Sequence, residues 1–129
     1  MSDDDIVVDA SAVLAFLNRE PFRGFDPERL ARATISALNF SEVLERLYNG
    51  GASHSDADGL VEPLGLKIIP FDEVQARTAA QLRATTRHAG LSLGDCACLA
   101  LGRQRSEPVV TADRVWASLD IGVEVILIR

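Results

Sequence analysis

The sequence has little of one residue type on which many nucleic-acid partners depend. Lys67 is the only lysine among 129 residues, and the formal net charge is −6. A protein that contacts nucleic acid broadly through its phosphates needs a basic face, so this composition argues against that mode of binding. It does not exclude an acidic pocket filled by metal, because bound cations reverse the local charge for a single phosphate.

Cysteine and histidine are also scarce. The chain has two of each, at Cys96, Cys98, His54 and His88. Cysteines two residues apart do not share a helix face, so this set does not predict a zinc site. We expect both thiols to be reduced and packed in the core, and both histidines to lie on the surface.

The chain has neither a long apolar run nor a basic leader. Its first residues, MSDDD, are negative where a secretory signal would be positive. Apolar stretches fall well short of the roughly 18 residues that a membrane span needs. We therefore expect a cytoplasmic protein without a membrane partner. The length and the 47% hydrophobic content favour one domain, residues 1–129, with its own core.

Short apolar stretches alternate with segments of helical spacing. The stretches that predict strands are Ile6–Val8, Leu66–Pro70, Pro108–Val110 and Val123–Ile128, with a weaker one at Ala33–Ala37. Helical spacing is found in Glu42–Tyr48, Asp72–His88 and Asp95–Leu101. In the second helix we expect Val74, Ala79 and Leu82 to form the buried stripe. The alternation predicts an α/β domain with a largely parallel sheet.

Four acidic residues stand where such a sheet would present its carboxyl edge. Asp9 follows the first strand, and Asp113 follows the strand at 108–110. Glu42 begins the helix after the weak strand, and Asp95 begins the apolar helix. Because ligands of open α/β sheets bind beyond the carboxyl ends of the strands, these side chains are candidates for one site.

Each carboxylate also has an ordinary structural explanation. Asn39 to Glu42 and Ser92 to Asp95 both fit the spacing of a capping box. Asp113 could cap a short helix at 114–119, and Asp9 could form an Asx turn. Both explanations stay open for each residue taken alone.

Four carboxylates at one place are harder to explain as caps. Two like charges about 4 Å apart repel by about 4 kcal/mol at an effective dielectric near 20. A hard cation such as Mg²⁺ removes this repulsion because it takes carboxylate oxygens as ligands. Ser11 and Thr111 lie two residues from Asp9 and Asp113 and could orient water or ligands. We expect the remaining acids to lie in a solvated N-terminal tail, on polar faces or in loops.

Four sequence blocks, in this order and spacing, resemble the PIN-domain ribonucleases. The blocks are VVDASAVLAFL, NFSEVLERL, GLSLGDCACLALG and VVTADRVW, and the likeness continues to the final VEVILIR. Within that family, the closest group is the VapC-type toxin of bacterial and archaeal toxin–antitoxin pairs. One block alone would be a weak signal, whereas four in register are specific.

The resemblance implies a three-layer α/β/α sandwich and an endonuclease that cuts RNA with Mg²⁺ or Mn²⁺. It places the catalytic, metal-binding acids at Asp9, Glu42, Asp95 and Asp113, with Ser11 and Thr111 in support. It also implies a homodimer and a cognate VapB-type antitoxin. Val115 stands two residues after Asp113, where acid-rich relatives often carry another acid, so a second metal is not predicted.

Two other functions remain as alternatives. A catalytically silent PIN-like domain would act only by binding a partner. A phosphoacceptor receiver domain would also have a metal-binding acidic pocket, but it usually needs paired acids at the end of the first strand and a lysine after a late strand. Here Asp3, Asp4 and Asp5 precede the strand, and Lys67 lies near the start of another one.

Overall fold

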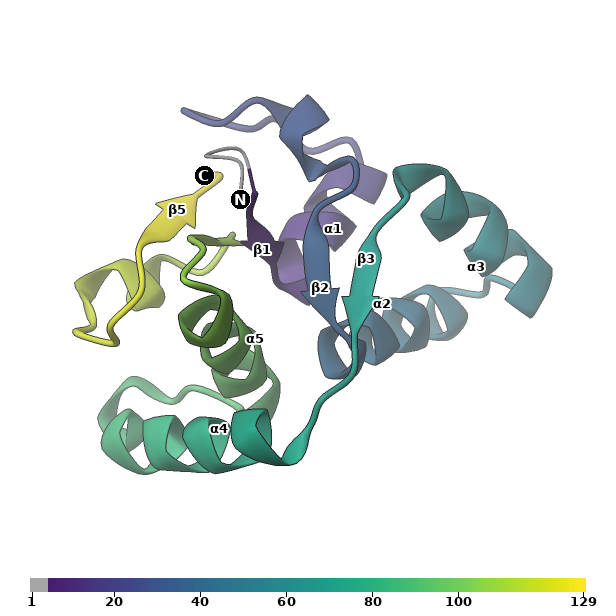
Figure 1. Cartoon of the computed structure of the whole chain (residues 1–129). Helices are drawn as coiled ribbons and strands as arrows, with labels where there is room; N and C mark the ends of the chain where they lie inside the picture. Colours follow the sequence, from purple (N-terminus) through teal and green to yellow (C-terminus); the bar gives the residue numbers. More distant parts are fainter. Residues whose placement is uncertain (1–4) are drawn as a thin grey trace.

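The computed structural model describes residues 5–129, and its centre is a five-stranded parallel sheet (Figure 1). The strands are β1 (Val7–Val8), β2 (Thr34–Ser36), β3 (Lys67–Ile69), β4 (Val109–Thr111) and β5 (Val125–Leu127). They lie in the order β3-β2-β1-β4-β5, and every neighbouring pair is parallel. All five expected strands are therefore confirmed, each within one or two residues of its expected bounds.

Helices cover both faces of this sheet. They are α1 (Ala10–Leu17), α2 (Ala37–Asn49), α3 (His54–Val61), α4 (Glu73–Thr85) and α5 (Leu93–Arg105). Figure 1 shows α4 and α5 on one side of the sheet, with α1 and α2 on the other. Short 3₁₀ helices occupy 27–30, 62–64, 87–89 and 114–118. The expected three-layer α/β/α arrangement is confirmed.

Alternation along β1 explains how one strand serves two cores. Val8 packs with the apolar side chains of α1 and α2, whereas Val7 packs with those of α4 and α5. Successive side chains of a strand point to opposite faces, so two adjacent valines can anchor both layers. β4 repeats the pattern, with Val110 on the first side and Val109 on the second.

Three local expectations were wrong or incomplete. Neither α1 nor α3 was predicted from the sequence. Each has eight residues, fewer than the roughly 10–12 over which helical spacing becomes distinct. In α4, Val74 is 61% exposed and Gln75 is buried in its place beside Ala79 and Leu82. The Gln75 amide makes this possible because it donates hydrogen bonds to the Pro70 carbonyl and the Gln104 side chain.

Several side-chain expectations can be compared with the structure directly. Cys96 and Cys98 are buried and free, and His54 and His88 are exposed, as expected. Glu107 does lie in a loop, but it is buried and paired with Arg105 rather than solvated. Asp3 and Asp4, expected in a solvated tail, lie outside the described residues.

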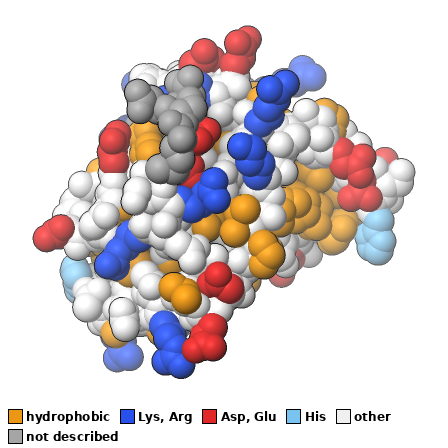
Figure 2. All heavy atoms as spheres, in the orientation of Figure 1, with side chains coloured by type: hydrophobic (Ala, Val, Ile, Leu, Met, Phe, Trp, Pro, Cys, Tyr) orange, Lys and Arg blue, Asp and Glu red, His pale blue; other side chains and the backbone are white. Residues whose placement is uncertain are grey.

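Two surface properties bear on partners. Within residues 5–129, no helix combines the length and apolar character needed to cross a bilayer. Figure 2 shows acidic and basic side chains interspersed over the face drawn there. On that face, charge is not divided into one basic and one acidic half.

Candidate active site

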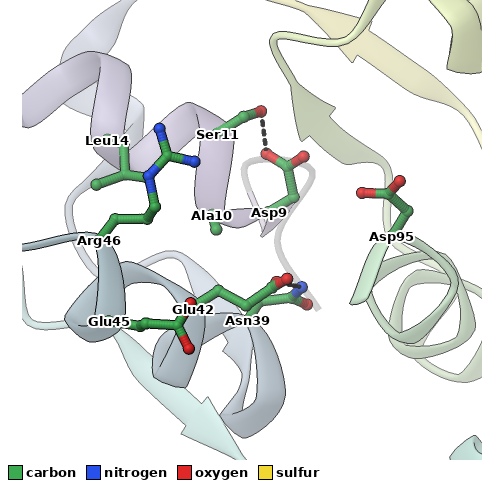
Figure 3. A pocket seen from close by; sticks show the side chains of 9 residues that line it. All are labelled: Asp9, Ala10, Ser11, Leu14, Asn39, Glu42, Glu45, Arg46 and Asp95. Atoms are coloured by element: carbon green, nitrogen blue, oxygen red, sulfur yellow. Dashed lines mark hydrogen bonds between the residues drawn. The ribbon is translucent and has the colours of Figure 1, made fainter. Parts of the chain in front are cut away.

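A cavity of about 260 Å³ lies at the carboxyl edge of the sheet, where the direction of winding reverses between β1 and β4. This reversal is the position at which α/β sheets commonly bind ligands. The residues lining the cavity are Asp9, Ala10, Ser11, Leu14, Asn39, Glu42, Glu45, Arg46 and Asp95 (Figure 3). Three of the four predicted acids therefore line one cavity, although they come from three distant segments of the chain.

Asp9 follows β1 directly and forms the N-cap of α1. Its Oδ1 accepts hydrogen bonds from the Ala12 backbone N–H at 3.0 Å and from the Ser11 hydroxyl at 2.7 Å. The expected Asx turn is therefore an N-cap, because the unpredicted helix α1 begins at Ala10. Capping and participation in a site are compatible here, since the same carboxylate does both.

The predicted supporting hydroxyls join the ends of β1 and β4. Thr111 donates to Oδ2 of Asp9 at 2.8 Å, and its oxygen accepts from the Asp113 backbone N–H at 3.1 Å. The Ser11 oxygen accepts from the Ala112 N–H at 3.0 Å and lies 3.3 Å from the Thr111 hydroxyl. Both oxygens of Asp9 are thus held by named donors, which fixes the plane of this carboxylate.

Burial raises the pKa of Asp9 to about 6, because the charged form loses most of its hydration. The hydrogen bonds from Ala12, Ser11 and Thr111 act in the opposite direction, and the negative charge of Asp95 adds to the increase. Only 5% of Asp9 is exposed. A buried carboxylate of this kind is stabilised in its charged form by a nearby cation.

Glu42 lies in the second turn of α2 rather than at its start. Ser36 is the N-cap of α2, so the expected capping box between Asn39 and Glu42 does not form. The Asn39 side-chain N–H₂ instead donates to Oε1 of Glu42 at 2.8 Å and to the Gly94 carbonyl at 2.9 Å. The capping explanation of Glu42 is therefore wrong. Its carboxylate is instead held by Asn39, which also contacts the start of α5.

Asp95 does form the expected capping box at the start of α5. Its backbone N–H donates to Ser92 Oγ at 3.1 Å, and its Oδ2 accepts from the Ser92 N–H at 2.9 Å. The buried Cys98, one turn later in α5, is affected electrostatically by all three cavity acids. Burial raises the pKa of the Cys98 thiol, and the charges of Asp9, Asp95 and Glu42 raise it further.

Asp113 has a different position from the other three acids. It is exposed, caps the 3₁₀ helix at 114–118 through the Val115 N–H, and does not line the cavity. Its connection to the site runs through its backbone N–H, which bonds the Thr111 hydroxyl. The capping explanation is confirmed for Asp113, while a direct role in the site stays a prediction.

The donor set of the cavity is that of a hard cation. Carboxylate and hydroxyl oxygens from Asp9, Glu42, Asp95 and Ser11 are the ligands that Mg²⁺ and Mn²⁺ prefer. Within residues 5–129, no group of three His, Cys, Asp or Glu side chains stands close enough to hold an ion as placed. The chemistry of the residues fits a divalent cation, and their side chains would have to converge on it.

Sequence reasoning missed four residues at this site. Among the described residues, Arg46 is the only basic one that lines the cavity, and Glu45 lines it although it was expected on a polar face. Asn39 and Gly94 contact Glu42 directly. The i, i+4 spacing of Glu42 and Arg46 could have indicated a shared helix face. No sequence signal joins Gly94 to a residue of another helix.

The fold and the cavity together define an α/β domain with an acidic site at the carboxyl edge of a parallel sheet. A family model described as the PIN domain matches residues 6–122. The chain therefore belongs to the PIN-domain family, as the four sequence blocks predicted. This membership excludes the receiver-domain alternative.

Known proteins with similar sequence or structure carry related names. Ribonuclease VapC28 of Mycobacterium tuberculosis is 29% identical over 127 residues, which cover 91% of this chain and 92% of that protein. The structure of VapBC2 from Rickettsia felis, bound to a DNA fragment from its promoter, matches with a TM-score of 0.74 at 13% identity, covering 96% and 98% of the two chains. Mycobacterium tuberculosis VapC20, described as a sarcin–ricin loop cleaving toxin, matches with a TM-score of 0.69 at 16% identity, covering 93% and 99%.

Proposed function

We propose that this protein is a Mg²⁺- or Mn²⁺-dependent endoribonuclease and the toxin of a VapBC-type toxin–antitoxin pair. The observation that carries the proposal is the meeting of Asp9, Glu42 and Asp95 in one cavity at the switch point of the sheet. Membership of the PIN-domain family and the 29% identity to a protein named ribonuclease VapC28 support the same function.

Different residues of the site would have different roles in phosphodiester hydrolysis. Asp9, Glu42 and Asp95 would hold the cation, with Asp113 joining them directly or through water. A bound Mg²⁺ or Mn²⁺ would lower the pKa of water and offset the charge that develops on the phosphate. Ser11 and Thr111 would keep the Asp9 carboxylate in one orientation through their hydrogen bonds.

Arg46 is suited to bind the RNA backbone beside this site. It is exposed, it lines the acidic cavity, and it also lines a neighbouring hollow with Leu14, Leu47 and Leu60. Its guanidinium makes none of the ion pairs found among residues 5–129. A free cation at the rim of an acidic cavity can bind a phosphate without first breaking a salt bridge.

The proposed partners follow from the family. Solved structures that share this fold include VapBC assemblies from Rickettsia felis and Salmonella typhimurium. We expect a cognate VapB-type antitoxin to cover the cavity of this protein and block RNA, and we expect the toxin to be a homodimer in the cytoplasm. Light scattering of the purified toxin, alone and with the product of the adjacent reading frame, would measure both assemblies.

Cleavage of a defined RNA by the purified protein tests the proposed function. We expect fragments in the presence of Mg²⁺ or Mn²⁺ and intact RNA in EDTA, with activity restored when the metal is returned in excess. Glu42→Gln is a suitable inactive control, because glutamine keeps an oxygen for the Asn39 hydrogen bond while removing the charge. Cleavage that is indifferent to chelator would contradict the metal site.

Binding without cleavage is the remaining alternative. A catalytically silent PIN-like module would bind the antitoxin but leave every RNA intact at all metal concentrations. A broad survey of transfer, ribosomal and messenger RNA separates this result from a narrow substrate preference. Sequencing the 5′ ends of fragments after induction of the toxin in cells supplies that survey.

A further inference from the structure

Asn39 joins the two helices that carry Glu42 and Asp95. It lies on α2, is only 1% exposed, and lines the cavity. One side-chain nitrogen donates both to Oε1 of Glu42 at 2.8 Å and to the Gly94 carbonyl at 2.9 Å. Among residues 5–129, the buried Asn39 oxygen has no hydrogen-bond partner. An unpartnered buried oxygen costs free energy, so the two hydrogen bonds from the nitrogen are what favour an amide at this position.

Gly94 completes this contact from the other helix. A Cβ atom built on Gly94 would lie 2.4 Å from Oε2 of Glu42 and 2.8 Å from both its Cδ and its Oε1. Any side chain here would therefore displace the Glu42 carboxylate. The absence of a side chain lets this carboxylate rest against the first turn of α5, one residue before Asp95.

We propose that Asn39 and Gly94 are positioning residues that hold the Glu42 carboxylate against the start of α5 for cation binding. This inference rests on the proposed function, because it gives Glu42 a cation to bind. Asn39 supplies the donor that orients the carboxylate, and Gly94 supplies the space that it fills. Neither residue is expected to touch the cation or the RNA.

Glu42 needs such positioning contacts because a glutamate side chain is long and flexible. Glu42 starts from the second turn of α2 and has several rotatable bonds, so its carboxylate could also point along the helix into solvent. A hydrogen bond from a buried amide restricts it to one arrangement before the cation arrives. Asp9 is restricted in the same way by Ser11 and Thr111.

Gln75 provides a matched control in the same protein. It is also a buried amide at 1% exposure, its nitrogen donates two hydrogen bonds, and its oxygen has no partner within the part of the chain that the structure describes. It contacts α5 at Gln104, nine residues beyond Asp95 and therefore about 13 Å further along the helix. Gln75→Ala removes an equivalent set of contacts without touching an acid of the cavity.

The test measures Mn²⁺ binding by calorimetry in the absence of RNA, together with thermal unfolding in EDTA. We expect Asn39→Ala and Gly94→Ala each to raise the Kd for Mn²⁺ by roughly 10–100-fold, the range typical of residues that orient metal ligands. Gln75→Ala should lower the Tm in EDTA to a similar degree as Asn39→Ala, yet leave the Kd within about twofold of the wild-type value.

A double mutant separates positioning from general damage. In a Glu42→Gln background the carboxylate is already neutralised, so Asn39→Ala should add less than about twofold to the Kd. If Asn39→Ala does not fold, Gly94→Ala in the two backgrounds provides the same comparison.

Two results would overturn the inference while leaving the proposed function intact. One is a wild-type protein that binds Mn²⁺ and cleaves RNA, with Asn39→Ala and Gln75→Ala changing the Kd equally. The other is an Asn39→Ala or Gly94→Ala effect that persists undiminished in the Glu42→Gln background. A wild-type protein that neither binds Mn²⁺ nor cleaves RNA would overturn the proposed function and this inference together.

Discussion

The Thr111 hydroxyl donates a 2.8 Å hydrogen bond to Oδ2 of Asp9, although the two residues are 102 positions apart in the chain. The contact is possible because β1 and β4 are parallel neighbours, paired from Val7 to Val109 and from Val8 to Val110. Residues that follow these two strands therefore emerge side by side. The orientation of Asp9, the most buried acid at the site, thus depends on Thr111 at the end of β4, the fourth of the five strands along the chain.

Thr111→Val should weaken both the fold and the activity. Valine keeps the shape but leaves Asp9 Oδ2 without its donor and the Asp113 N–H without its acceptor. We expect a loss of about 1–3 kcal/mol in the free energy of unfolding and a roughly 10–100-fold loss of RNA cleavage. Urea unfolding and a cleavage assay at saturating Mg²⁺ measure the two effects. Thr111→Ser, which retains the hydroxyl, should restore most of the activity; equal defects in both variants would contradict the role of the hydroxyl.

The raised pKa of Asp9 predicts how stability depends on pH in the absence of metal. The folded protein holds the Asp9 proton up to about pH 6, whereas the unfolded chain releases it near 3.8. The free energy of unfolding therefore loses about 3 kcal/mol from this group as pH rises from about 4 to above 6. Asn has no proton to lose in this range, so the free energy of unfolding of Asp9→Asn should not fall in the same way. Urea unfolding in EDTA should therefore show the stability of the variant rising relative to that of the wild type as pH increases across that window.

The exposed Asp120 supplies a control for this titration. Asp120→Asn should follow the wild-type pH dependence within about 0.5 kcal/mol, as surface substitutions usually do. A stability difference between Asp9→Asn and the wild type that stays constant from pH 4 to pH 7 would show that the Asp9 pKa is not raised by folding.

Arg46→Gln should weaken RNA binding more than it slows the chemical step. Loss of one phosphate contact should raise KM several-fold and reduce the slope of log K against log salt by about 0.7 for single-stranded RNA. Arg103→Gln removes the same charge from the last turn of α5, away from the cavity, and serves as the control. If the two variants have the same KM and salt slope, Arg46 does not bind the substrate backbone.

Cys96 and Cys98 should be inert in the folded protein. Both are buried, and burial raises the pKa of both thiols, so little thiolate is available at neutral pH. We expect an aromatic disulfide reagent to label neither residue in the native state and both in denaturant. Rapid native labelling at neutral pH would show that α5 opens or that the thiols are accessible.

The sequence predicted those parts of the fold that depend on local periodicity. All five strands, α4 and the central parts of α2 and α5 follow from apolar runs and helical spacing. The start of α2 was missed because Asn39 and Glu42 imitate a capping box, whereas the N-cap in the structure is Ser36. Val74 was expected in the core because it is apolar, but the paired amide of Gln75 takes that place.

The site was predictable to the extent that one topological rule applies. Asp9 follows β1, Asp95 lies in the first turn of α5, and Glu42 lies one turn into α2; all three are near the carboxyl edge of the sheet, and the structure brings them to one cavity. Asp113 obeys the same rule but lies exposed outside the lining. Contacts between side chains of different helices, such as Asn39 with Gly94, leave no periodic trace in a single sequence.

Anomalous diffraction from crystals grown with Mn²⁺ tests the central claim most directly, because it locates the cation without reference to activity. The account predicts a Mn²⁺ peak in the cavity, with oxygens of Asp9, Glu42 and Asp95 turned toward it and bound at about 2.0–2.3 Å. The same crystals show whether Asp113 joins them directly or through water. A fully folded protein with no peak in this cavity at saturating Mn²⁺, or with its only peak elsewhere, would contradict the account.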